Sequence, residues 1–292
     1  MMYYRRKILL ALIESFDGNL KNTDCEKLLF NFCKTTGKNH YDFFPHRFGP
    51  FSFVSYYDKR RLIELGLLES AQDFKLKKNH SYLREIEPSD RKALIELKAS
   101  GLLGKRLIQK TYRENPQFTV KSEILDKLFE EDEIKRLRFS WNTDHSPFVF
   151  TIGYEGETID SFLYKLISNN IMAIVDIRSN PQSMKYGFSK KSFSVYIEKA
   201  GLKYFHIPEL GIPSEMRKGL GQTVTHKKLF DKYETSLLPK QKEAKANLLS
   251  LISKHPRIAL VCFERDHHFC HRHTLVENLK KEKTLSRSVI HL

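Results

Sequence analysis

The stretch FVFTIGYEGETIDSFLYKLISNNIMAIVDIRS, residues 148–179, decides the fold of this chain. It contains an apolar run of strand length at 148–154, a segment with helical periodicity at 159–170 and a second apolar run at 172–179. Two buried strands joined by a helix are typical of a parallel sheet, because parallel strands need a crossover connection. The sequence therefore predicts an α/β domain over residues 146–292.

The same alternation continues toward the C-terminus. We expect a helix at about 190–200, a strand at 203–208, a helix at about 229–253, a strand at 257–263 and a helix at about 272–280. This order predicts a mainly parallel sheet with helices on both faces. Ligands of such sheets bind beyond the carboxyl ends of the strands, so functional residues are expected there.

Residues 1–145 follow another pattern and are predicted to form a mostly helical, winged-helix-like interaction domain with a connector. Apolar residues recur at helical spacing over 3–16. A second helix is expected to be capped by Thr23 or Asp24 and to end at Gly37.

Two short motifs of this N-terminal domain, KLLF at Lys27–Phe30 and FGPF at Phe48–Phe51, resemble the small helical domains of the Panacea and YwgA-like families. The resemblance covers roughly the first 70 residues and implies an interaction or regulatory domain. The aromatic side chains of this segment are equally explained as core residues.

The composition points to a polyanionic partner. The chain has 50 Lys and Arg against 35 Asp and Glu, a net charge of +15, which favours nucleic acid, with DNA preferred, or a nucleotide. A basic protein without such a partner is the alternative. No apolar run approaches the roughly 20 residues of a membrane span. Four cysteines without a secretory signal indicate a cytoplasmic protein. The sequence leaves a homodimer open.

Polar residues follow each of the four predicted strands. They are Tyr154 after the first, Asp176, Arg178 and Ser179 after the second, His206 and Glu209 after the third, and Cys262, Glu264, Cys270, His271 and Arg272 after the fourth. A doubly wound sheet brings the carboxyl ends of its strands to one rim, so we expect these side chains to lie close together.

The ordered motifs TIGYEG, VDIRSNP, GLKYFHIPELG and LVCFERDHHFCHRH are similar to the successive signatures of the DUF488 family, over about residues 149–280. The resemblance implies a compact α/β domain with a polar rim. It implies no reaction.

Carboxylates are the strongest candidates for chemistry at this rim. Alternation along a strand places Asp176 and Arg178 on one side of their strand, and Cys262 and Glu264 on one side of theirs. We expect Asp176 or Glu264 to activate water and His271 to assist as a catalytic residue. The alternative is that these acids form structural ion pairs with arginines.

Basic and aromatic residues near the rim are candidates for substrate binding. The planar guanidinium groups of Arg178 and Arg272 suit phosphate, as does the helix start after Cys270. The irregular segment 210–230 is expected to close over a ligand, with Arg217 and Lys218 on phosphate. The remaining candidates are Tyr154, Ser179, Lys185 and Tyr186.

The two late cysteines do not predict a metal site. Seven residues separate Cys262 from Cys270, which is not the short spacing of a zinc knuckle, and the nearby histidines offer no clear ligand set. We therefore expect no metal and no other cofactor. Cys270 is either a packed thiol or a nucleophile activated by His271.

These observations predict a hydrolase that acts on nucleic acid or a nucleotide, with cleavage of an N-glycosidic bond favoured. The alternative is a non-catalytic sensor or regulator that binds DNA or a nucleotide. Antiphage defence is one process in which such a protein could act.

Overall fold

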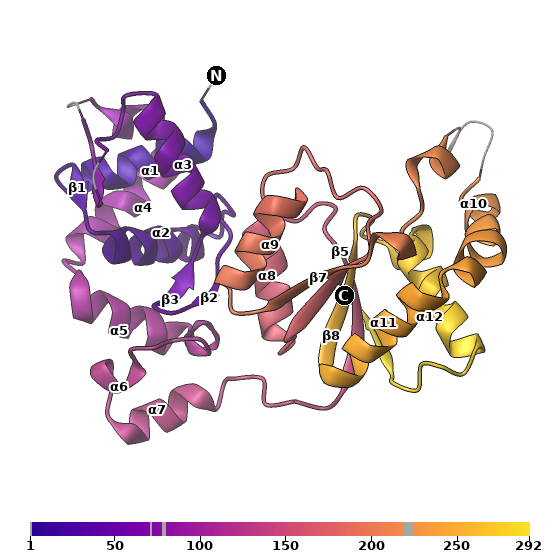
Figure 1. The fold of residues 1–292 in the computed structure, drawn as a ribbon. Coiled ribbons are helices and arrows are strands. Elements are labelled where there is room, and N and C mark those ends of the chain that lie inside the picture. The colour runs from indigo at the N-terminus through magenta and orange to yellow at the C-terminus, as the bar shows by residue number, and fades with distance from the viewer. Residues whose placement is uncertain (1, 71, 78–79, 219–224) are drawn as a thin grey trace. The chain divides into compact units, whose positions relative to one another are not determined.

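The computed structural model describes residues 2–70, 72–77, 80–218 and 225–292. The chain divides into two compact units, Met1–Trp141 and Asn142–Leu292 (Figure 1). The expected boundary after residue 145 falls in the irregular stretch before the first strand of the second unit. Among the described residues, we find no helix with the length and apolar character that crossing a membrane requires.

The first unit is mostly helical, as expected. Its helices are α1 (Tyr4–Ser15), α2 (Asn22–Thr36), α3 (Phe53–Glu64), α4 (Pro88–Ala99), α5 (Gly104–Glu114), α6 (Leu125–Leu128) and α7 (Glu131–Arg138). Two short antiparallel pairs accompany them: β1 (Asn19–Leu20) with β4 (Phe74–Lys75), and β2 (Phe44–His46) with β3 (Gly49–Phe51). The winged-helix assignment stays a prediction.

The start of α2 differs from the expected one. The helix begins at Asn22, and its N-cap residue is Lys21, which makes no side-chain capping bond within the described part of the chain. Instead of capping α2, Asp24 accepts a hydrogen bond from the backbone N–H of Gly104 at 2.7 Å. The other end is as predicted, because Gly37 has a φ of 65° and forms a left-handed C-cap.

Replacing Gly37 by Ala should destabilise the first unit by about 1 kcal/mol, because a Cβ is unfavourable at positive φ. A Cβ here would meet no described atom within 4 Å, so the cost is conformational and not steric. Gly37→Asn is the matched control and should cost less, since Asn tolerates this conformation. Urea denaturation monitored by hydrogen exchange on peptides of α2 checks both values; equal stability of the Ala variant and the wild type would contradict them.

The second unit contains a five-stranded parallel sheet with strand order β7-β6-β8-β5-β9. The strands are β5 (Phe148–Gly153), β6 (Ala173–Asp176), β7 (Lys203–His206), β8 (Arg257–Cys262) and β9 (Val289–His291). Four of them were expected from the sequence, and β9 was not. The predicted α/β class with a parallel sheet is confirmed.

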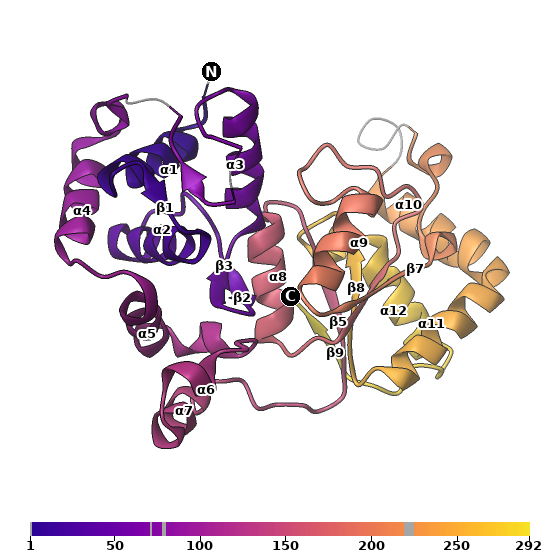
Figure 2. The same cartoon turned by 60° about the vertical axis from the view of Figure 1, so that its left-hand side comes forward.

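Helices cover both faces of this sheet. They are α8 (Ile159–Ser168), α9 (Lys190–Lys199), α10 (His226–Lys232), α11 (Lys242–Lys254) and α12 (His271–Lys281). Figures 1 and 2 show α8 and α9 on one face of the sheet and α11 and α12 on the other. Alternate strand residues serve the two faces: Val175 and Leu260 belong to the core cluster that includes residues of α11 and α12.

The single helix expected at 229–253 is interrupted. A π-helical turn, Tyr233–Leu237, and a 3₁₀ turn, Leu238–Lys240, separate α10 from α11. The physical reason is Pro239, whose ring removes a backbone donor and prevents a continuous α-helix.

Candidate functional site

The register of the sheet brings all four of the predicted strand ends to one edge, since His206 at the end of β7 pairs with Asp176. Gly153 at the end of β5 pairs with Cys262 at the end of β8, and Asp176 at the end of β6 pairs with Val261. Because β6 and β8 are neighbours, the residues that follow them lie at the same carboxyl edge. We call this edge the rim.

Asp176 forms a buried ion pair with Arg178. The side chain of Asp176 has 0% exposure, and its oxygens accept from Nε of Arg178 at 2.8 Å and from its NH2 at 2.6 Å. The hydroxyl of Tyr204 donates to the same carboxylate at 2.9 Å. Loss of a buried carboxylate that is bonded to a buried arginine destabilises the fold, because the arginine is left without its counter-ion. These contacts match the ion pair with an arginine that the sequence left as an alternative for Asp176.

Arg178 is also engaged with protein groups. Its NH1 donates to the hydroxyl of Tyr154 at 2.9 Å and to the carbonyl of Phe188 at 2.8 Å, and the residue is 4% exposed. The guanidinium lies over the ring of Tyr154, 4.9 Å from its centroid. Arg178 thus fixes Tyr154 at the end of β5, and little of its guanidinium is left for phosphate.

Tyr204→Phe should destabilise the second unit by about 1.5 kcal/mol, because the hydroxyl donates to the charged Asp176. The substitution keeps the ring and its edge contact with Phe193, whose centroid is 5.8 Å away. Hydrogen exchange of the β6 and β7 amides in urea measures the change. Unaltered protection of these amides would show that the bond contributes nothing to stability.

A cluster of four potential ligands lies beside this ion pair, and we call it the rim cluster: Cys262, Glu264, Cys270 and His271. Cys262 Sγ lies 3.3 Å from Glu264 Oε2 and 3.5 Å from His271 Nδ1, and Cys270 Sγ lies 4.0 Å from that same nitrogen. One ligand atom from each of the four residues lies within 4.8 Å of all the others. Cys262 ends β8, Glu264 lies in the loop that follows, Cys270 is the N-cap of α12 and His271 is its first residue.

Burial and neighbouring charges shift the pKa values of the rim cluster in different directions. Burial and the neighbouring Cys270 raise the pKa of Cys262 well above its usual range. Burial also raises the pKa of Cys270, but hydrogen bonds from Cys262 and His271 and the charges of His271 and Arg272 lower it well below the usual range. Burial, followed by the charge of Cys270, raises the pKa of Glu264. The pKa of Cys270 is thus shifted down and that of Cys262 up.

Arg272 is placed differently from the expectation. Its side chain is fully buried, and it donates to the backbone carbonyls of Glu264 at 2.5 Å and Arg265 at 2.9 Å. It therefore fastens the loop between β8 and α12 and does not present its guanidinium to a phosphate at the rim.

Two glycines allow loops to lie directly on the strand ends. A Cβ on Gly153 would overlap the backbone carbonyl of Glu264, and one on Gly211 would overlap the backbone of Ile177 and Ser179. In both places a loop meets the backbone at a distance that only glycine permits. The loop carrying Glu264 is thereby held against the end of β5.

A cavity of about 370 Å³ opens at the rim. It is lined by Tyr154, Arg178, Ser179, Asn180, Gln182, Ser183, Met184, Ser214, Arg217, Cys262 and Phe263. Four of the predicted binding residues, Tyr154, Arg178, Ser179 and Arg217, are therefore brought together here. Sequence reasoning missed Phe263. Its place directly after an apolar strand could have drawn attention to it, and the structure shows that it is 42% exposed.

The other predicted binding residues lie outside the lining of this cavity. Lys185 donates to the carbonyl of Tyr154 at 3.0 Å, and the hydroxyl of Tyr186 bonds to that of Tyr196. Ser179, although it lines the cavity, directs its hydroxyl to the carbonyl of Ile212 at 2.7 Å. Lys218 is exposed. The segment 210–230 is described except for residues 219–224, so the expected closure over a ligand falls partly outside the described residues.

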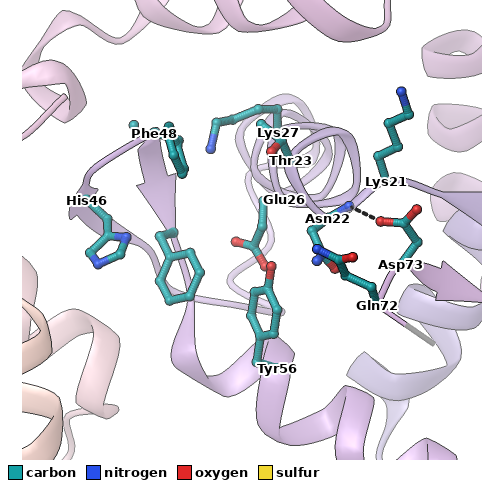
Figure 3. A pocket seen from close by; sticks show the side chains of 12 residues that line it. Lys21, Asn22, Thr23, Glu26, Lys27, His46, Phe48, Tyr56, Gln72 and Asp73 are labelled. Atoms are coloured by element: carbon teal, nitrogen blue, oxygen red, sulfur yellow. Dashed lines mark hydrogen bonds between the residues drawn. The ribbon is translucent and has the colours of Figure 1, made fainter. Parts of the chain in front are cut away.

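The first unit has a cavity of its own, of about 540 Å³ (Figure 3). Glu26 is 2% exposed and accepts hydrogen bonds from the backbone N–H of Ser52 at 3.1 Å and from the hydroxyl of Ser55 at 2.5 Å. Figure 3 shows Glu26 and Tyr56 pointing toward one another. Burial raises the pKa of Glu26 to about 7. Sequence reasoning missed this site, because Glu26 lies beside the KLLF motif, which was interpreted only as a resemblance.

The second unit therefore belongs to the α/β class with a parallel sheet and a polar rim at the carboxyl ends of its strands. Residues 158–279 match the model of a family described as Domain of unknown function DUF488. The match agrees with the resemblance to DUF488 that the motifs indicated. Comparison with curated proteins and with solved structures gives no match.

Proposed function

We propose that the second unit is a hydrolase of nucleic acid or a nucleotide that cleaves an N-glycosidic bond, with Glu264 activating the water. The observation that carries this proposal is the position of Glu264. Its carboxylate is half-buried, contacts the thiol of Cys262, and Cys262 in turn lines the rim cavity. A carboxylate beside a cavity at the carboxyl edge of a parallel sheet is well placed to orient water toward a bound substrate.

The lining of the cavity supports a nucleotide as the substrate. Phe263 offers an exposed aromatic face, and its ring meets that of Tyr154 edge-on at 5.3 Å between centroids. Such a surface suits stacking of a base. Arg217 in the same lining can bind phosphate through its planar donors, and the net charge of +15 favours approach of a polyanion.

The number of available acids favours base removal over cleavage of the phosphodiester. Glu264 is the carboxylate of the rim cluster, and Asp176 is occupied by Arg178. Phosphodiester cleavage by two metal ions needs several acids around both ions. Removal of a base needs one carboxylate-oriented water and a pocket for the base.

The test is incubation of the full-length protein with labelled DNA, modified DNA, RNA and nucleotides, followed by mass analysis of the products. We expect a free base and an abasic strand or sugar phosphate. Shortened strands without free base would contradict N-glycosidic cleavage, and the absence of any product from all substrates would contradict hydrolysis.

A non-catalytic sensor is the second candidate, and the cavity of the first unit favours it. That cavity combines a buried carboxylate with polar and aromatic lining, which suits a small polar ligand. Filter binding over a salt series distinguishes the two functions. Steep salt dependence without product would support the sensor, whereas product formation would support the hydrolase.

A further inference from the structure

The rim cluster has the ligand types and the approximate spacing of a tetrahedral metal site. With Zn–S of about 2.3 Å and Zn–N of about 2.0 Å, the edge between sulfur and nitrogen in a tetrahedron is about 3.5 Å. His271 Nδ1 lies 3.5 Å from Cys262 Sγ and 4.0 Å from Cys270 Sγ. To bind one ion between these three atoms, Cys270 Sγ would have to approach Nδ1 by about 0.5 Å and the ring of His271 would have to turn.

The second nitrogen of His271 has the partner that a metal-binding histidine needs. Its Nε2 lies 3.4 Å from the carbonyl oxygen of Ile177, just beyond the end of β6. Histidines that bind a metal through one nitrogen commonly donate the other N–H to a carbonyl or carboxylate, which fixes the tautomer and the ring. Nδ1 is then the nitrogen left to bind an ion. Cys262 Sγ lies 3.5 Å from Nδ1 and 4.0 Å from Nε2, so the imidazole ring must turn to direct the Nδ1 lone pair toward an ion between the sulfurs.

The three atoms are also held in place and shielded. Cys262 and Cys270 are each 1% exposed, and His271 is 2% exposed. The loop that joins them is fastened by Arg272 to the carbonyls of Glu264 and Arg265. Such an arrangement fixes ligand positions before an ion arrives.

We propose that Cys262, Cys270 and His271 bind one zinc ion, with Glu264 beside a fourth, open coordination position. Two thiols and an imidazole are ligands that zinc accepts in tetrahedral geometry, and three protein ligands with one water are typical of catalytic zinc. Glu264 is assigned to the open position because it alone of the rim cluster is half-exposed.

The metal site itself is independent of the proposed hydrolysis. Its consequence for chemistry rests on the proposed function: zinc lowers the pKa of a bound water to about 7, and Glu264 lies where it can accept the proton of that water. Glu264 would take the proton of the water, and the hydroxide would attack the sugar carbon. The base would leave with the electron pair of the broken bond and take up the proton from Glu264.

The test is the zinc content of the full-length protein, purified with reductant, dialysed against a competing chelator and measured by mass spectrometry. We expect about one zinc ion per chain in the wild type, as for a site with three fixed ligands. Cys262→Ser, Cys270→Ser and His271→Ala should lose it. Glu264→Gln should keep it. Loss of zinc from the Gln variant would make Glu264 a fourth ligand and overturn the open position.

Matched controls come from the other cysteines and from a second cluster. Cys25→Ser and Cys33→Ser change buried thiols of the first unit and should retain zinc. His267, His273 and His291 also place nitrogens within 4.8 Å of one another, so His291→Ala tests whether the ion binds there instead. Zinc lost from His291→Ala but kept by Cys270→Ser would overturn the proposal.

Cobalt substitution of the wild type keeps the proposal testable if the ligand variants fail to fold. Cobalt bound by two thiolates in a tetrahedral site gives sulfur-to-metal charge-transfer absorption and intense visible bands. Absence of these bands from reduced wild-type protein, together with no retained zinc, would overturn the site. Metal content and absorption are measured without substrate. A failure of the proposed hydrolysis can therefore be told apart from a failure of the zinc site.

Discussion

Replacing Glu264 by Gln is expected to reduce turnover by at least about 100-fold, the contribution of a positioned general base, while binding of nucleic acid stays nearly unchanged. The amide is close in size to the carboxylate but cannot accept a proton from water. Glu264 is half-buried next to the rim cavity, so the loss should fall on the chemical step and not on affinity.

The measurement is single-turnover kinetics on the substrate identified by the product screen, with affinity determined in parallel by filter binding. Glu277→Gln is the matched control, because Glu277 lies on α12 and pairs with Lys280 at 2.9 Å. We expect it to retain wild-type rates. Equal losses of rate and of affinity in Glu264→Gln would place Glu264 in binding instead of catalysis.

Asp176→Ala is expected to destabilise the second unit by about 3–5 kcal/mol, since it leaves a buried arginine without its counter-ion. The side chains of Asp176 and Arg178 are 0% and 5% exposed, so water cannot replace the lost partner without opening the structure. The hydroxyl of Tyr204 loses its acceptor as well.

Hydrogen exchange on peptides of β6 and β8 gives the free energy of opening in the second unit, separately from the first. Glu277→Ala removes an exposed ion pair and should cost at most about 1 kcal/mol. If Asp176→Ala kept wild-type protection but lost activity, Asp176 would regain the catalytic role that the sequence first suggested.

The fold of the second unit could be predicted because three of its strands, β5, β6 and β8, are buried on both faces. Residues of β5, β6 and β8 form continuous apolar runs, and the helices between them have clear periodicity. The strand β9 carries no such signal. It has three half-buried residues, and it is defined by its pairing with β5, which the local sequence does not reveal.

The site was only partly predictable, for a different reason. The alternation of side chains predicted that Asp176 and Arg178 lie on one side of the sheet. It did not show whether Asp176 activates water or forms an ion pair with an arginine. Four donors on that carboxylate decide it, and one of them, Tyr204, comes from β7. Likewise, the spacing of Cys262 and Cys270 in the sequence argued against a shared metal ion. In the structure, the loop between them folds back, so that both sulfurs lie within 4.0 Å of His271 Nδ1.

The two tight contacts at Gly153 and Gly211 have a consequence for protein engineering. In a randomised library aimed at new substrate preference, variation at either position would displace a loop backbone and yield mainly misfolded clones. The stretch from Asn180 to Met184 lines the same cavity through side chains that are exposed or half-buried. Diversity introduced there would reshape the pocket while the strand ends stay intact.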